Sequence, residues 1–247
     1  MESSDKKIIS SFEIQEELNP DIWFFDGENY KMKPGIRDSL LKIVEDYIEF
    51  TNIDVDVEDV TLTGSLSNFN WSPFSDVDLH ILVDFKNENL LLKKYLDSRR
   101  IIWNSLRDIT IKDFDVEIYA QDMNEPHFAS GVYSVLYNDW LVQPKKDEVM
   151  IDVEKILSKT KNWMEKIDKI ERDAKKGDPE EILDRIVKLK DKIKKYRGGG
   201  LKDRGEYSYE NLTFKFLRRN DYLKKINDVR NTLIDKTLTV EEKVSGI

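Results

Sequence analysis

Residues 64–80 read Gly-Ser-Leu-Ser-Asn-Phe-Asn-Trp-Ser-Pro-Phe-Ser-Asp-Val-Asp-Leu-His, and this stretch decides both the predicted fold and the predicted site. A Gly-Ser pair follows an apolar run and is separated by residues 66–75 from two aspartates, Asp76 and Asp78, which lead into a second apolar run. Alternate side chains of a β-strand share a face, so the two aspartates are expected to point the same way. Such a pair repels unless it is neutralised, and a hard divalent cation with oxygen ligands does this well.

The Gly64-Ser65 pair predicts a turn that holds phosphate. Backbone N–H groups and a hydroxyl at such a turn can bind phosphate oxygens. Ser65 is therefore a candidate phosphate ligand, and the alternative is a serine that only caps the turn. The turn and the aspartates together predict a site for a metal–nucleoside triphosphate.

This order of a Gly-Ser pair, a spacer and Asp-x-Asp on a strand resembles the signature of the DNA polymerase beta-like nucleotidyltransferase superfamily, over about residues 60–120. The resemblance implies Mg²⁺- or Mn²⁺-dependent transfer of a nucleoside monophosphate from a nucleoside triphosphate to an acceptor hydroxyl, with release of pyrophosphate. Asp76 and Asp78 would bind the metal, and Gly64 and Ser65 would bind the phosphates. Two ions would assist an in-line attack on the α-phosphate.

The superfamily also needs a third carboxylate on a neighbouring strand, and residues 113–119 alternate between apolar and polar side chains. Glu117 is the first choice because Val116 and Ile118 flank it, and Asp115 is the second. Glutamate departs here from the aspartate that is commoner in the superfamily. The third ligand is therefore predicted to be Glu117.

Residues 208–215 predict a helix that carries two further candidates. Asn211 and Lys215 are four residues apart and so share a helical face. The resemblance implies that a helical domain presents a lysine and small polar residues to the triphosphate and the base, which makes both residues candidate nucleotide ligands. The alternative for Lys215 is an ordinary solvated lysine.

The predicted fold is α+β: a nucleotidyltransferase-type mixed sheet with flanking helices over residues 1–145, then a helical domain over residues 146–247. Residues 1–20 are polar and are expected to be loosely held. Strands are predicted at about 59–63, 76–85, 108–111 and 114–120, a helix at about 34–51, and a hairpin at 132–142. A helix from Asn87 to about Leu106 is expected to bury the stripe Leu91, Tyr95, Ile102 and Leu106.

The helical domain is predicted to hold three helical regions with one glycine-rich loop. The helix that begins at Pro179, with Asp178 as its N-cap, follows from the capping pattern. Residues 197–205 contain Gly-Gly-Gly and are predicted to form a loop, which is either a flexible connector or a mobile flap over the substrate. The last region is expected to break near Asn220.

The composition limits the function further. The chain has no cysteine, so a disulfide scaffold and a thiolate site are excluded. Its net charge is −9, and 39% of its residues are hydrophobic. No apolar leader or membrane-spanning run is present, which favours a soluble, cytoplasmic protein with no membrane partner. Residues 151–247 hold 25 Lys and Arg against 19 Asp and Glu, a net charge of +6. These lysines are interleaved with acids, so solubility and contact with an anionic substrate are equally good explanations.

Three acceptor classes are left open: RNA, a nucleotide or other small molecule, and a protein side chain. The weak basicity of the second half, without a long basic groove, weighs slightly against a processive polymerase. The rival hypothesis is a non-catalytic interaction protein that retains the nucleotidyltransferase fold. A metal-dependent phosphodiesterase or nuclease would fit the paired acids but not the Gly-Ser turn.

Overall fold

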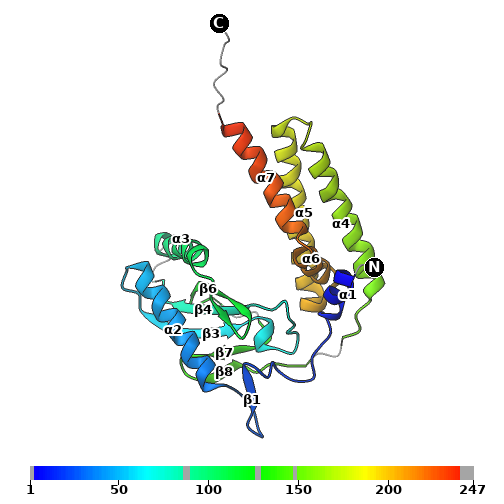
Figure 1. The fold of residues 1–247 in the computed structure, drawn as a ribbon. Helices are drawn as coiled ribbons and strands as arrows, with labels where there is room; N and C mark the ends of the chain where they lie inside the picture. The colour runs from blue at the N-terminus through cyan, green and yellow to red at the C-terminus, as the bar shows by residue number, and fades with distance from the viewer. Residues whose placement is uncertain (1–2, 86–89, 126–128, 147–148, 240–247) are drawn as a thin grey trace. The chain divides into compact units, whose positions relative to one another are not determined.

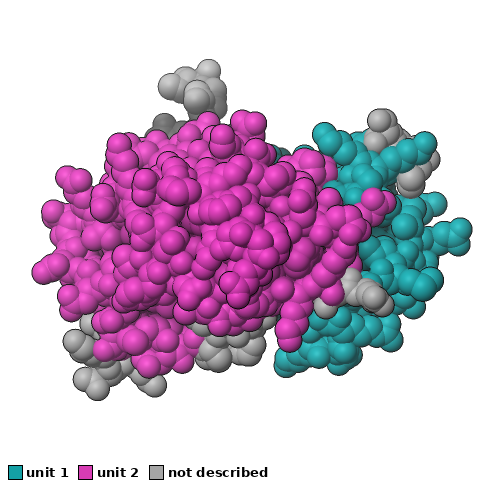
Figure 2. All heavy atoms as spheres, turned by 90° about the horizontal axis from the view of Figure 1, so that it is seen from below, with its two compact units in different colours: residues 1–12, 149–247 teal, residues 13–148 magenta. Residues whose placement is uncertain are grey.

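The computed structural model describes residues 3–85, 90–125, 129–146 and 149–239 (Figure 1). The chain divides into two compact units, one of residues 13–148 and the other of residues 1–12 and 149–247 (Figure 2). The N-terminal residues therefore belong to the helical unit, although the sequence assigned them to the sheet domain and predicted them to be loosely held. They form helix α1 (Ser3–Ser10), and Ile8 and Phe12 are buried.

The unit of residues 13–148 is built on a mixed six-stranded sheet of order β5-β6-β4-β3-β7-β8. Strand β4 pairs parallel with β6 and antiparallel with β3, and the other pairs are antiparallel. A separate hairpin of β1 (Trp23–Phe25) and β2 (Tyr30–Met32) precedes the sheet. The α+β class is confirmed. The sheet strands are β3 (Val57–Thr63), β4 (Val77–Val83), β5 (Thr110–Ile111), β6 (Phe114–Asp122), β7 (Val132–Ser134) and β8 (Asp139–Val142).

Helix α2 (Pro34–Thr51) begins and ends where the sequence predicts. Proline is favoured in the first turn because its missing N–H needs no partner there. Asn52 ends the helix in the left-handed conformation and donates its N–H to the carbonyl of Glu49. The predicted apolar stripe packs into the core of the sheet unit, with Leu40 and Tyr47 fully buried.

Helix α3 (Leu90–Leu106) is the crossover between the parallel strands β4 and β6. Its predicted start at Asn87 lies outside the described residues. The predicted inward stripe is wrong: Leu91 is 79% exposed and Leu106 is 65% exposed, whereas Leu96 and Trp103 are each 1% exposed. Apolar residues cover a wide arc of the helix surface, and the half of this arc that contains Leu96 and Trp103 is buried in the core.

The second unit is formed by α-helices and one short 3-10 helix. Asp152 and Asp178 accept the N–H groups of Lys155 and Glu181, so each caps the start of its helix, as predicted for Asp178. The predicted break near Asn220 is also confirmed. Within the described ranges, none of the helices combines the length and apolar character needed to cross a membrane. The elements are α4 (Val153–Asp173), α5 (Pro179–Arg204), η2 (Gly205–Tyr207), α6 (Tyr209–Arg219) and α7 (Tyr222–Leu238).

The predicted glycine-rich loop is wrong, because α5 continues through all three glycines to Arg204. Glycine disfavours a helix by about 1 kcal/mol per residue relative to alanine, so tertiary packing must outweigh this cost. Gly200 shows how: a Cβ atom there would lie 2.4 Å from the Cβ of Glu210 and 2.7 Å from the Oγ of Ser208. The start of α6 therefore packs directly against the backbone of α5, and no flap exists at this position.

We expect the two faces of α3 to respond differently to truncation. Leu96→Ala should lower the free energy of unfolding by about 2–5 kcal/mol because it leaves a cavity in the core, whereas Leu91→Ala should change it by less than about 0.5 kcal/mol. Urea unfolding followed by tryptophan fluorescence measures both. An equal loss of stability in the two variants would contradict the observed orientation of α3.

Candidate metal centre

The parallel pairing of β4 with β6 places two carboxylates side by side. Asp78 and Glu117 are register partners, and Asp76 directly precedes β4. Each of the three residues offers a carboxylate oxygen, and these oxygens all lie within 4.8 Å of one another. The side chains are half-buried, so solvent screens their mutual repulsion only in part.

The structure brings Glu117, and not Asp115, into this group. Both residues lie on the same face of β6, but Asp115 pairs with Thr110 on the edge strand β5 and is exposed. Val116 and Ile118 on the opposite face are buried. The alternation in the sequence therefore identified the face, and the register between strands selected the residue.

Gly64 lies against Asp78 and has a backbone that favours glycine, with φ 76° and ψ −159°. A Cβ atom on Gly64 would lie 1.9 Å from Oδ2 of Asp78 and 2.9 Å from its Cγ. Rotation of the carboxylate alone would not relieve this overlap. The turn and the acidic group are therefore one site, with the glycine making room for the aspartate.

Hydrogen bonds hold the spacer between the turn and the aspartates. Ser65 donates its hydroxyl to Oγ of Ser75 at 2.7 Å, and Ser75 also accepts the N–H of Ser72. Ser67 donates to the carbonyl of Gly131 at 2.9 Å. Ser65 is half-buried, and its hydroxyl now bonds across the loop, so a phosphate ligand would have to replace Ser75 as its acceptor.

Tyr119 is a member of the site to which sequence reasoning assigned no role. Its hydroxyl donates to Oε2 of Glu117. Burial raises the pKa of Tyr119, and the carboxylates of Glu117 and Asp78 raise it further, so the phenol keeps its proton and acts as a donor. The signal was present in the alternation of residues 113–119, which puts Tyr119 on the face of Glu117.

His80 extends this polar face but does not join the acidic group. Its Nδ1 lies 2.7 Å from Oε1 of Gln121, and its ring centroid lies 5.2 Å from that of Tyr119. His80 pairs with Tyr119 in the β4–β6 register. This pair lies two residues along the strands from the pair of Asp78 and Glu117, on the same face of the sheet. These contacts are those of a histidine that is bonded to its neighbours on the polar face.

The donor set fits a hard divalent cation such as Mg²⁺ or Mn²⁺. Such ions prefer carboxylate oxygens as ligands, and three of these lie within 4.8 Å of one another here. No histidine or cysteine belongs to the group, which disfavours zinc. Asp76, Asp78 and Glu117 are thus the residues that could hold the metal.

Asn211 and Lys215, the two predicted nucleotide ligands, lie on α6 in the helical unit. Asn211 is 1% exposed. Its amide nitrogen donates to the carbonyl of Glu206, and its amide oxygen accepts from Nε of Arg197 at 3.0 Å. These bonds tie α5 and η2 to α6, which gives Asn211 a structural role; its role as a nucleotide ligand stays a prediction.

Lys215 is mostly buried and lies 3.6 Å from the carboxylate of Glu206. Burial is the main cause that lowers the pKa of Lys215; Glu206 opposes it, and Arg219 and Arg218 add to it. The role of Lys215 as a nucleotide ligand stays a prediction.

Comparison with family models, curated proteins and solved structures gives no match to this chain. The resemblance found in residues 60–120 therefore stays a prediction. The chemistry of the site follows from its own residues and their geometry.

We expect Gly64→Ala to displace the Asp78 carboxylate and to weaken Mn²⁺ binding by at least ~10-fold, because the new methyl group occupies the position of Oδ2. The strained backbone should also cost about 1–3 kcal/mol of stability. Titration calorimetry with Mn²⁺ and thermal unfolding measure the two effects. Gly35→Ala is the matched control, since nothing lies within 4 Å of its new Cβ; wild-type metal affinity in Gly64→Ala would contradict the proximity of Gly64 to Asp78.

Tyr119→Phe should weaken Mn²⁺ binding about 10-fold, because a ligand that loses its hydrogen-bond donor is less well oriented. The phenylalanine ring keeps the packing against His80, so stability should change by less than about 1 kcal/mol. Tyr137→Phe removes a hydroxyl from an exposed tyrosine outside the site and serves as the control. Equal metal affinity in both variants would show that Tyr119 does not position Glu117.

Proposed function

We propose that this chain is a metal-dependent nucleotidyltransferase of the polymerase beta-like kind, which moves a nucleoside monophosphate from a nucleoside triphosphate to an acceptor hydroxyl. The observation that carries the proposal is the convergence of Asp76, Asp78 and Glu117 beside the Gly64-Ser65 turn. Carboxylates alone would suit many metal sites. The addition of a turn that suits phosphate, in contact with one of the metal ligands, favours a metal–triphosphate.

Each residue has a defined part in this proposal. Asp76, Asp78 and Glu117 bind the cation, and Tyr119 orients Glu117. Ser65 exchanges its bond to Ser75 for a phosphate oxygen. Bound Mg²⁺ or Mn²⁺ supplies charge neutralisation for the triphosphate and lowers the pKa of the acceptor hydroxyl. Asn211 and Lys215 are the proposed nucleotide ligands of the helical unit.

The proposed reaction is an in-line displacement at the α-phosphorus. The acceptor oxygen forms a new P–O bond, and the bond between the α-phosphorus and the α,β-bridging oxygen breaks. Pyrophosphate leaves with the electron pair of that bond. The proton of the acceptor hydroxyl passes to a carboxylate of the site or to water.

Binding of a non-reacting triphosphate is the sharpest test of the proposal. We expect α,β-methylene analogues of the nucleoside triphosphates to bind in the presence of Mn²⁺, with affinity lost at least ~100-fold in Asp76→Asn/Asp78→Asn. The change to asparagine keeps the shape of the side chain and removes the charge that binds metal. Titration calorimetry, with and without Mn²⁺, measures the effect and identifies the preferred base.

The matched control is Asp113→Asn/Asp115→Asn, which removes the same charge from exposed acids at the start of β6. This variant should bind within ~2-fold of wild type. If folded wild-type protein binds no triphosphate, the rival hypothesis of a non-catalytic interaction protein is favoured. If binding occurs and labelled nucleotide is hydrolysed without transfer, a phosphodiesterase is favoured instead.

A further inference from the structure

The helical unit carries a groove along the seam between α4 and α5 that is lined mainly by cations. The groove has a volume of about 260 Å³. Ile170 and Leu189 are buried at its base, while most of its cations are exposed. The lining cations are Lys166, Lys169, Arg185, Lys188 and Lys192.

Carboxylates neutralise only part of this charge. Arg185 bonds to Asp173 at 2.6 Å, and Lys188 forms an exposed pair with Asp184 one turn away on the same helix. Such exposed pairs contribute little and open readily. Lys166, Lys169 and Lys192 have no carboxylate within ion-pair distance in the part of the chain that the structure describes. The groove therefore keeps a net positive potential.

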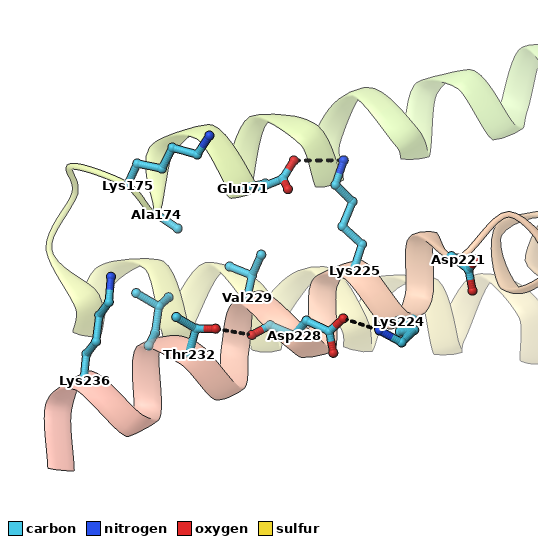
Figure 3. Close-up of a pocket in the computed structure, with 11 residues that line it drawn as sticks. Glu171, Ala174, Lys175, Asp221, Lys224, Lys225, Asp228, Val229, Thr232 and Lys236 are labelled. Carbon is cyan, nitrogen blue, oxygen red and sulfur yellow. Dashed lines mark hydrogen bonds and ion pairs between the residues drawn. The ribbon is translucent and has the colours of Figure 1, made fainter. Parts of the chain in front are cut away.

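A larger groove of the same unit, between α4 and α7, is lined by carboxylates as well as by lysines (Figure 3). Its volume is about 570 Å³. There, Lys225 bonds to Asp168 and Glu171, and Lys224 bonds to Asp228. The α4–α7 groove thus carries carboxylates in its own lining, which pair with two of its four lysines and leave Lys175 and Lys236 outside ion-pair distance of a described carboxylate. The lining of the α4–α5 groove contains no carboxylate.

Two aromatic rings continue the α4–α5 seam. Trp163 and Tyr196 are half-buried, and their ring centroids lie 5.6 Å apart. Nζ of Lys166 lies 4.6 Å from the ring of Trp163, and Nζ of Lys159 lies 5.5 Å from that of Tyr196. Cations next to partly exposed aromatic rings form the combination that holds a flexible polyanion whose bases can stack.

We infer that the α4–α5 groove binds single-stranded nucleic acid, with Lys166, Lys169 and Lys192 on phosphates and Trp163 against a base. Small anions need fewer cations than a seam of this extent offers. The inference revises the sequence-based expectation that the helical domain has no basic groove, because lysines and acids that alternate in the sequence separate onto different faces of the helices. The further step, that this nucleic acid is the acceptor, rests on the proposed function.

The test is fluorescence anisotropy of a labelled, mixed-sequence single-stranded RNA with the full chain. The triple variant Lys166→Glu/Lys169→Glu/Lys192→Glu should weaken RNA binding by at least ~10-fold. It should also reduce the slope of log K against log salt concentration by about 2, because each lost phosphate contact removes about 0.7 from that slope. The corresponding glutamine variant should show a smaller loss in the same direction. Circular dichroism confirms that both variants keep their helices.

The matched control is Lys161→Glu/Lys194→Glu/Lys236→Glu, which makes the same change of net charge at exposed positions outside the α4–α5 groove. It should bind RNA within ~3-fold of wild type. Equal losses in the two triple variants would overturn the inference, since they would show attraction by net charge alone. Absence of RNA binding by wild type, or binding to phosphatidylserine vesicles without RNA binding, would also overturn it.

Two further measurements separate this inference from the proposed function. RNA should quench the fluorescence of wild type, and Trp163→Phe should remove most of that quenching, which a purely structural tryptophan would not do. Asp76→Asn/Asp78→Asn should bind RNA as wild type does, because the α4–α5 groove contains no metal ligand. RNA binding without metal-dependent triphosphate binding would therefore support the groove while contradicting nucleotidyl transfer.

Discussion

The parallel pairing of β4 with β6 is the constraint on which the rest of the site depends. The period of a strand is two, so burial of Val77 and Leu79 on β4 and of Val116 and Ile118 on β6 forces their neighbours onto the opposite face. A slip of one residue would bury charged groups and expose the apolar ones. Hydrophobic burial on one face of the sheet therefore sets which carboxylates meet on the other face.

This burial acts against a local electrostatic cost. The carboxylate oxygens lie within 4.8 Å of one another, and two unit charges at that distance repel by about 3.5 kcal/mol at an effective dielectric constant near 20. The surrounding residues accommodate the cost in distinct ways: Gly64 leaves space for Asp78, and the protonated Tyr119 donates to Glu117. An acidic group of this kind could hold a cation, because a bound cation would replace the repulsion between carboxylates with attraction.

In the helical unit, packing gives residues of the same type different environments. Lysines and acids alternate along α4, α5 and α7, yet α4 and α7 face each other with paired charges, whereas α4 and α5 leave several lysines unpaired. Gly200 illustrates the same dependence on neighbours, since the close approach of α6 makes glycine suitable inside a helix that local propensity disfavours. The neighbouring helix therefore determines which lysines are paired and where glycine is tolerated.

The sequence by itself determined the elements whose signals are local: the start of α2 at Pro34, the cap of α5 at Asp178, the strand that carries Asp78 and the polar face of β6. These follow from chain geometry and from periodicity over a few residues. The sequence also ranked Glu117 ahead of Asp115, and the strand register places Glu117 beside Asp78. Only the tertiary structure decided that Tyr119 joins the acidic group, that α3 buries Leu96 instead of Leu91, and that three glycines stay helical. Each of these outcomes depends on strand register or on the surface of a distant segment, which short-range patterns do not contain.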